Sequence, residues 1–241
     1  MKIRVAAFFL LCVVLAGCEW MQWKVIKPAG QVQTEAREVS SAARIKLAGN
    51  YQVQLTPGDK TTLRIEADTR FLSYILTRME DGELVIRNRD NVRFSGDDPV
   101  KIYITTPLLE KISLAGSGNI TGMGKFTGAD MLELKIAGSG DIQLATNTPR
   151  IHVEIAGTGS IKLAGETQDA DIHIAGSGDY LAEELKAENA RVEVAGSGNV
   201  RLFAASKLDV QIAGVGSVFY KGNPAITQSI TGSGEIKKLD Q

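Results

Sequence analysis

The chain has 241 residues, of which 44% are hydrophobic and 23% charged, so it can bury the core of one large domain or two small ones. Its formal net charge of −1 argues against binding of nucleic acid through a basic surface. The 25 glycines, 6 prolines and low aromatic content of 6% favour tight turns at regular intervals rather than disorder.

The N-terminus has the features of an export signal. Two basic residues precede an apolar segment, residues 5–15, that is too short to span a bilayer comfortably. The following Leu15-Ala16-Gly17-Cys18 resembles the lipobox of bacterial lipoproteins, which implies cleavage before Cys18 and diacylation of its thiol. We therefore expect a lipoprotein signal peptide over residues 1–17 and a lipidated tether over residues 18–37.

This anchor would make the membrane a partner, through the lipid on Cys18, and would place the protein in the cell envelope. Glu19 favours the outer membrane, because an Asp at that position resembles an inner-membrane retention signal. Cys12 would leave with the signal peptide, so the mature chain could form no internal disulfide. The alternative is an uncleaved anchor or a plain secretory peptide in which Cys18 is incidental.

Residues 38–110 alternate apolar and polar side chains with a period of two, which predicts β-strands separated by turns. The predicted strands cover residues 43–47, 51–55, 63–67, 84–86 and 100–104. Residues 71–78 are a candidate short helix. We expect this block to cap or to start a stack of strands, because an open sheet edge invites pairing with other chains.

A short phrase, Ala-Gly-Ser-Gly followed by a small polar and then an apolar residue, occurs seven times with minor substitutions. Its first glycines are separated by 22, 19, 19, 20, 18 and 18 residues, and such a near-fixed period is typical of stacked repeats. We expect both glycines of each phrase to form a corner where successive repeats stack closely. These glycines are Gly116, Gly118, Gly138, Gly140, Gly157, Gly159, Gly176, Gly178, Gly196, Gly198, Gly214, Gly216, Gly232 and Gly234.

Alignment of the repeats on their first glycine shows apolar columns two and four residues before it and four after it. Identical columns at one period favour parallel stacking of like on like. We therefore predict an all-β fold, a parallel β-solenoid with repeats of about 20 residues over residues 111–241. A series of antiparallel hairpins is the alternative, but it gives no reason for the same columns in every unit. Length differences fall in return segments such as 165–169, and charges after residue 234 are expected to guard the last coil.

These tandem units resemble the head GIN domain family of putative autotransporter adhesins. Two upstream segments share the resemblance, Gly82-Glu83-Leu84-Val85-Ile86 and residues 100–112, so that it covers roughly residues 38–238. The resemblance implies a right-handed β-helix related in shape to pectin-lyase-like folds, and an export-associated, adhesive role. The family supplies no established catalytic residues, so none is assigned here.

Two outward columns, three and five residues before the first glycine, carry the polar side chains that could do chemistry. His152 and His173 lie in these columns on adjacent repeats, but we expect no metal site, because no cysteine or reliable acidic trio completes one. Carboxylates that could serve a glycosidase also lie there, and we interpret them as solvated partners of Lys135 and Arg191. They are Glu133, Glu154, Asp171 and Glu193.

The polar column that follows each corner contains Asp141 and Asp179, separated by Ser160. Stacked acids can bind calcium, but the period differs from that of calcium-binding repeats, so capping of the corner backbone is the better interpretation. We predict no cofactor and no catalytic residue.

The sequence thus favours a non-enzymatic envelope lipoprotein that presents a rigid solenoid surface to an envelope or extracellular protein or a glycan. A carbohydrate-active enzyme on a pectin-lyase-like scaffold is the second hypothesis. A structural or regulatory envelope protein that docks a partner is the third. No nucleic acid is expected as a partner.

Overall fold

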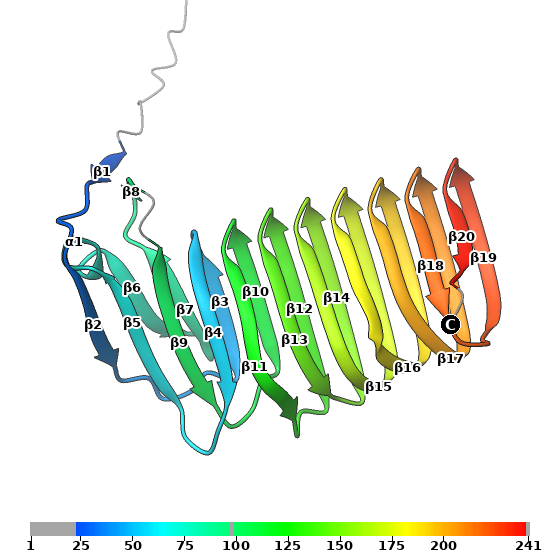
Figure 1. Ribbon diagram of the computed structural model, residues 1–241, viewed down its shortest axis with the longest axis horizontal. Helices are drawn as coiled ribbons and strands as arrows, with labels where there is room; N and C mark the ends of the chain where they lie inside the picture. Colours follow the sequence, from blue (N-terminus) through cyan, green and yellow to red (C-terminus); the bar gives the residue numbers. More distant parts are fainter. Residues whose placement is uncertain (1–22, 97–98, 240–241) are drawn as a thin grey trace, which may run out of the picture.

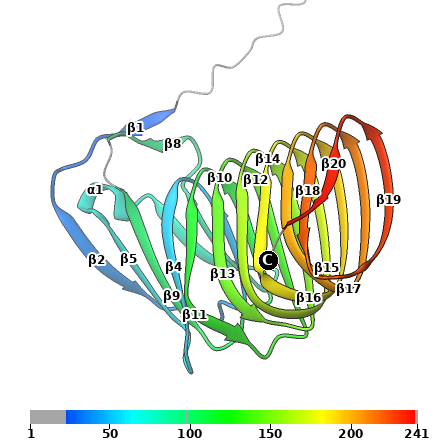
Figure 2. The same ribbon diagram turned by 45° about the vertical axis from the view of Figure 1, so that its right-hand side comes forward.

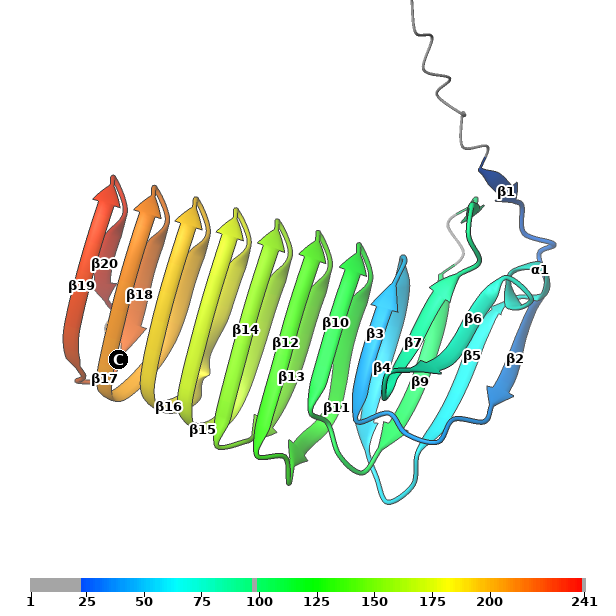
Figure 3. The ribbon, with the colours of Figure 1, turned by 180° about the vertical axis from the view of Figure 1, so that it is seen from behind.

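The structure, a computed structural model, describes residues 23–96 and 99–239 and is an all-β solenoid of about 7 turns (Figure 1). Its coils stack side by side, and their strands form two walls that Figures 1 and 3 show from opposite sides. Eighteen strands belong to one sheet, and 2 strands form a separate pair. The predicted parallel β-solenoid is therefore confirmed, and the hairpin alternative is wrong.

The first wall contains the strands that lead into the glycine corners, paired in parallel and in register. Its spatial order is β7 (Glu83–Asn88), β3 (Arg44–Ala48), β10 (Lys111–Gly116), β12 (Met131–Gly138), β14 (Arg150–Gly157), the second halves of β15 (Ser160–Gly176), β16 (Asp179–Gly196) and β17 (Asn199–Gly214), and finally β19 (Ala225–Gly232).

The second wall contains the strands that leave the corners, and they also pair in parallel. Its order is β9 (Val100–Thr106), β4 (Tyr51–Pro57), β11 (Asn119–Thr127), β13 (Asp141–Asn147), the first halves of β15, β16 and β17, then β18 (Ser217–Lys221) and β20 (Glu235–Lys238).

The core lies between the two walls and is made of the predicted apolar columns. Ile172, Val192 and Val210, each four residues before a first glycine, are 0% exposed. Branched side chains of this kind fit the pleated inner face of a strand and pack on the same column of the next coil. The repeated apolar column therefore becomes a continuous apolar stack along the solenoid axis.

The Gly-Ser-Gly phrase forms the corner that joins the first wall to the second. At one such corner the Ser177 amide donates to the Gly157 carbonyl at 2.9 Å, and at the next the Ser197 amide donates to the Gly176 carbonyl at 2.8 Å. The hydrogen-bond ladder thus continues through the corners, and each corner lies directly on its neighbour. The ladder begins before the first full phrase, since the Gly49 amide donates to the Ala115 carbonyl at 3.0 Å.

The residue 38–110 block both starts and caps the solenoid. The β3–β4 coil lies between the β7/β9 level and the β10/β11 coil, so the chain crosses the β3–β4 coil as it passes from β9 to β10. Beyond β9, strands β5 (Thr62–Asp68) and β2 (Val32–Arg37) add in antiparallel fashion, as does β6 (Ile75–Glu80) beside β7. Figure 2 shows this cap at one end and β19 at the other.

The folded part of the chain begins earlier than the expected tether boundary at residue 37. The β2 strand pairs with β5, and β1 (Lys24–Ile26) pairs in parallel with β8 (Val92–Phe94). The buried Asp68 carboxylate accepts three backbone amides of the lead-in, Ala29 at 2.7 Å, Gly30 at 2.8 Å and Gln31 at 3.3 Å. Residues 24–37 are therefore part of the domain. Only residues 18–22 of the expected tether, with the signal peptide and Cys18, lie outside the described residues.

Two further local expectations differ from the structure. The candidate helix over residues 71–78 is a single turn, α1 (Thr69–Leu72), and the rest of that segment enters β6. The return segment 165–169 is not a loop but part of β15. Its backbone pairs with β13 at Gly165 and Glu166, with β14 at Asp169, and with β16 along most of the segment. Among the described residues, no helix is long and apolar enough to cross a membrane.

The C-terminal end of the solenoid is less guarded than the sequence suggested. The expected charges lie on β20, as Glu235, Lys237 and Lys238. The neighbouring β19 contains no charged residue, and each of its eight residues is exposed. The guard therefore covers only one of the two walls at this end.

Candidate functional site

The outer face of the first wall carries a continuous ladder of charged side chains. In-register pairing places the two outward polar columns of successive coils side by side, so that acidic and basic side chains alternate along the wall. We call this set the charge ladder. In order of contact it comprises Glu83, Lys111, Glu133, Lys135, Glu154, His152, Asp171, His173, Glu193 and Arg191.

The first half of the charge ladder consists of lysine–glutamate pairs. Lys111 Nζ lies 3.3 Å from Glu133 Oε2, and Lys135 Nζ lies 2.8 Å from Glu133 Oε1 and 3.0 Å from Glu154 Oε2. Partial burial would raise the pKa of Glu133, but Lys135 and Lys111 outweigh it and hold that pKa below its usual range. The hydrogen bond to Glu133 in turn raises the pKa of Lys135.

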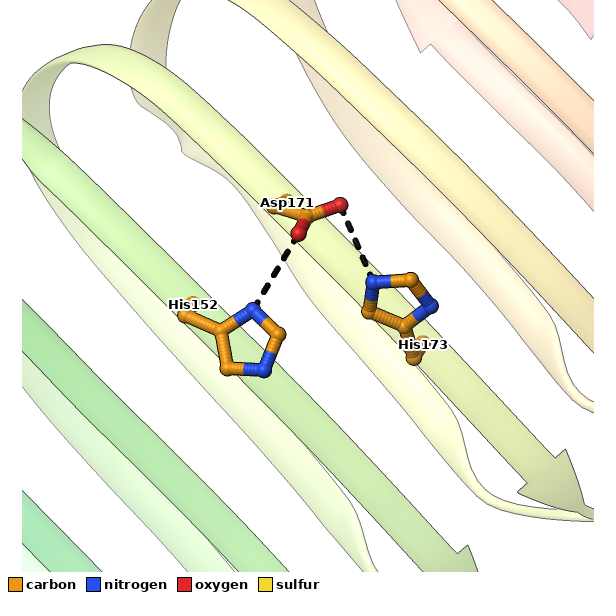
Figure 4. Close-up of side chains that lie close together, drawn as sticks. All are labelled: His152, Asp171 and His173. Atoms are coloured by element: carbon orange, nitrogen blue, oxygen red, sulfur yellow. Dashed lines mark hydrogen bonds and ion pairs between the residues drawn. The ribbon is translucent and has the colours of Figure 1, made fainter.

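The second half of the charge ladder places Asp171 between two imidazoles, as Figure 4 shows. His152 Nδ1 lies 3.2 Å from Asp171 Oδ2, and His173 Nε2 lies 3.1 Å from Asp171 Oδ1. The outer nitrogens of the same rings face glutamates, with His152 Nε2 2.9 Å from Glu154 Oε1 and His173 Nδ1 3.1 Å from Glu193 Oε2. Each imidazole is thus held between two carboxylates.

The sequence placed His152 and His173 correctly on adjacent coils but missed the group that joins them. Asp171 is two residues before His173 on the same strand and pairs in register with His152 on the neighbouring strand. The aligned outward columns contain Asp171, but they identify it only as one of the carboxylates that could serve a glycosidase. Its side chain brings three donor atoms within 4.8 Å of one another.

The glutamates of the charge ladder have the electrostatics of ion-pair partners rather than of a catalytic acid. The His152 and Lys135 hydrogen bonds lower the pKa of Glu154, and the Arg191 hydrogen bond lowers that of Glu193. A glycosidase acid must hold its proton near neutral pH and therefore needs a raised pKa. The arrangement favours charge pairing over acid catalysis at these two residues.

The carboxylates of the acidic residues after the corners accept hydrogen bonds from backbone amides of the next coil. Asp141 Oδ1 accepts from the Ser160 amide at 3.1 Å, and Asp179 Oδ1 accepts from the Asn199 amide at 3.0 Å. These carboxylates therefore cap backbone amides one coil away, in line with the capping interpretation.

A shallow groove lies beside the C-terminal half of the charge ladder, on the same wall. It has a volume of about 520 Å³ and crosses five coils, from β14 to β19. Its floor is the column of exposed alanines directly before the corners, Ala156, Ala175, Ala195 and Ala213. One flank carries Glu154, His173, Glu193, Gln211 and Ser229, so it changes from ionic to uncharged along its length.

The groove owes its shape to small side chains at a fixed place in each repeat. Because strands in a sheet lie about 4.8 Å apart, five coils give it a length of about 19 Å. The polar column on this flank is visible in the aligned repeats, whereas the alanines look unremarkable until the coils are stacked. A straight groove of this length on a rigid wall suits an extended ligand.

The chain matches a known protein family. A family model described as "Putative auto-transporter adhesin, head GIN domain" matches residues 43–224. No curated protein sequence matches the chain significantly.

Solved structures with the same architecture come from Bacteroides and Parabacteroides species. A putative adhesin from Bacteroides fragilis is 28% identical, with a TM-score of 0.85, and the match covers 89% of this chain and 100% of that one. A putative lipid binding protein from Parabacteroides distasonis is 26% identical, with a TM-score of 0.73, over 90% and 100% of the two chains. A putative adhesin from the same organism is 21% identical, with a TM-score of 0.70 over 90% and 100%, and supports the fold alone.

Proposed function

Because the chain belongs to the head GIN domain family of putative auto-transporter adhesins, we propose that it is a non-enzymatic binding module of the cell envelope. The observation that carries this proposal is the alanine-floored groove on the first wall. A solenoid holds such a surface rigid, because each coil of the groove except the last, at β19, is fixed by its neighbours on both sides. Little ordering entropy is then lost when a ligand binds.

The groove would hold an extended glycan or peptide against its alanine floor, with the polar flank supplying hydrogen bonds. The lowered pKa values of Glu154 and Glu193 argue against a role for either as a general acid. One relative, from Parabacteroides distasonis, is a putative lipid binding protein, so lipid is a further ligand class to include in the tests.

A binding screen against glycans, extracellular matrix proteins and lipids tests this proposal, with substitutions on the floor of the groove. Ala175→Arg places a long side chain in the groove without entering the core, since Ala175 is exposed. We expect it to weaken binding of any hit by about tenfold or more. Ala137→Arg is the matched control, because Ala137 is exposed in the same column but lies outside the groove.

Equal effects of the two arginine substitutions would place the ligand elsewhere. Turnover of uronic-acid polysaccharides by the purified protein, abolished by one carboxylate substitution, would favour the enzyme hypothesis instead. Co-purification of a stoichiometric envelope protein would favour the docking hypothesis.

We also propose that the chain is anchored in the outer membrane by a lipid on Cys18, on the strength of the Leu15-Ala16-Gly17-Cys18 motif. The described domain begins at residue 23, so a short linker would hold the cap of the solenoid near the bilayer. Cys18→Ser should release the protein from the membrane fraction and abolish its labelling with palmitate. Palmitate labelling that persists in this variant would exclude Cys18 as the acylated residue.

A further inference from the structure

We propose that His152, Asp171 and His173 form a binding site for a divalent transition metal ion such as Zn²⁺, on the outer face of the first wall. Two imidazoles and one carboxylate are a ligand set that zinc accepts, with water in the remaining position. The three residues come from the neighbouring strands β14 and β15, so the ion would also link two coils.

Two of the three donor-atom separations match those of ligands on one ion, and all three atoms lie within 4.8 Å of one another. Bonds of about 2.0–2.1 Å at tetrahedral angles place two ligand atoms about 3.3 Å apart. His152 Nδ1 and His173 Nε2 lie 3.2 and 3.1 Å from the two oxygens of Asp171.

The glutamates on the far side of each ring supply the second feature of a metal centre. Ligating histidines commonly donate their other N–H to a carboxylate, which fixes the ring orientation and raises its basicity. Glu154 faces His152 Nε2 at 2.9 Å, and Glu193 faces His173 Nδ1 at 3.1 Å. With the protons held on those nitrogens, both lone pairs point toward Asp171.

Asp171 itself lacks a full set of partners. Its Oδ1 atom is shielded from solvent and has no hydrogen bond of acceptable geometry among the described residues, although His173 Nε2 lies 3.1 Å away. A neutral imidazole that donates to its glutamate presents a lone pair to this carboxylate, and two acceptors repel. A divalent metal ion between the two rings would satisfy all three groups together.

The site is accessible from solvent. The side chains of His152, His173 and Asp171 are 20%, 36% and 43% exposed, so an ion can enter without opening the fold. His173 and its partner Glu193 also line the groove, so the proposed site lies at the edge of the groove. The metal proposal stands on the side-chain cluster alone and does not require that the groove bind a ligand.

The site is tested by calorimetric titration with Zn²⁺ of the full chain, which is purified in detergent and carries no polyhistidine tag. We expect one ion per chain with a dissociation constant at or below the micromolar range. His152→Gln and His173→Gln should each weaken binding by about tenfold or more, because each removes one of three ligands. Glu193→Gln should weaken it by about tenfold through loss of the orienting contact.

Asp171→Asn and Asp209→Asn form the matched pair of carboxylate substitutions. Asp209 lies in the same outward column, two coils further along, so both changes remove the same charge from the same face. Only Asp171→Asn should reduce affinity.

Cobalt gives a second measurement that does not depend on variants that fold. These are the two histidines of the whole chain, so Co²⁺ bound as proposed should broaden or shift the ring signals of both in the wild-type NMR spectrum. Absence of saturable Zn²⁺ binding, or binding that both histidine variants retain, would overturn the proposal. So would Co²⁺ that leaves the two imidazoles unaffected.

Discussion

The glycines of each corner meet two separate requirements. Gly176 has φ +125°, which side chains rarely adopt, and a Cβ there would lie 2.5 Å from the Gly157 carbonyl oxygen. Gly178 has no unusual φ, but its Cβ would lie 2.6 Å from the Gly159 oxygen and 2.5 Å from Ile155 Cγ2. The first glycine is therefore required by both its backbone conformation and the close stacking of the coils, and the second is required by the stacking alone.

Three alanine substitutions separate these requirements. Gly82→Ala tests strain alone, since Gly82 has φ +78° with nothing within 4 Å of its Cβ position, and should cost about 1 kcal/mol. Gly178→Ala tests the clash alone and should cost about 2–3 kcal/mol. Gly176→Ala combines both and should cost about 3–5 kcal/mol, measured as the free energy of unfolding in urea. Equal losses for Gly82→Ala and Gly176→Ala would show that the corners do not depend on close stacking.

The N-terminal cap depends on one buried carboxylate. Asp68 accepts the amides of residues 29–31, which lead into β2, and the amide of Arg70 at 2.9 Å, which begins α1. Burial would raise the pKa of Asp68, but these amides outweigh it and hold the pKa below its usual range. The ionised form is therefore the one that fastens the lead-in to the cap.

Stability should depend on pH through this residue. Since the folded pKa lies below the unfolded value of about 3.9, the stabilisation is complete above that pH and is lost as the pH falls through the folded pKa. Asp68→Asn should lower the midpoint of thermal unfolding at pH 7, and the difference from wild type should narrow below about pH 4. The exposed Asp130 provides the control Asp130→Asn, for which we expect little difference at either pH. If the difference in unfolding midpoint between Asp68→Asn and wild type stays constant down to pH 2, the charge of Asp68 does not contribute to stability.

The elements differ in how far the sequence could predict them. The coils after residue 110 follow from columns at fixed spacing, because stacking repeats the same environment for each copy. The β3–β4 coil was not recognised as part of the corner ladder, since its Gly49-Asn50 turn lacks the repeated phrase. The β2 strand gave no apolar signal, because five of its six residues are exposed and its pairing with β5 is distant in sequence.

At the candidate site, the sequence predicts which residues lie side by side but not how their side chains are directed. The aligned columns correctly place His152 and His173 on neighbouring coils. They do not show that the Asp171 side chain lies between the two rings, because that depends on rotamers chosen by all of the surrounding charges. The groove was missed for a different reason: a column of alanines becomes a concave floor only beside the larger side chains of the flanking column.

At the scale of the whole molecule, the two ends of the solenoid are unlike. Antiparallel strands and α1 cover the N-terminal end, whereas β19 has a neighbouring strand on one side only among the residues that the structure describes. Its inward column also changes character, since Gln228 replaces the apolar residue found in every other copy. Because each coil of a solenoid contacts only its neighbours, stability should vary along the stack and fall toward β19.

Two isoleucines at the same place in their repeats measure this gradient. Ile174 and Ile230 both lie two residues before a first glycine, but they are 2% and 38% exposed. Ile174→Ala should lower the free energy of unfolding by about 2–5 kcal/mol, because it leaves a cavity between two coils. Ile230→Ala should cost less than about 1 kcal/mol, since solvent or small shifts fill the space at the open end. Hydrogen exchange should agree, with faster exchange in β19 than in β14. Equal losses at the two positions would instead mean that β19 is covered in solution, by another molecule or by a second copy of the chain.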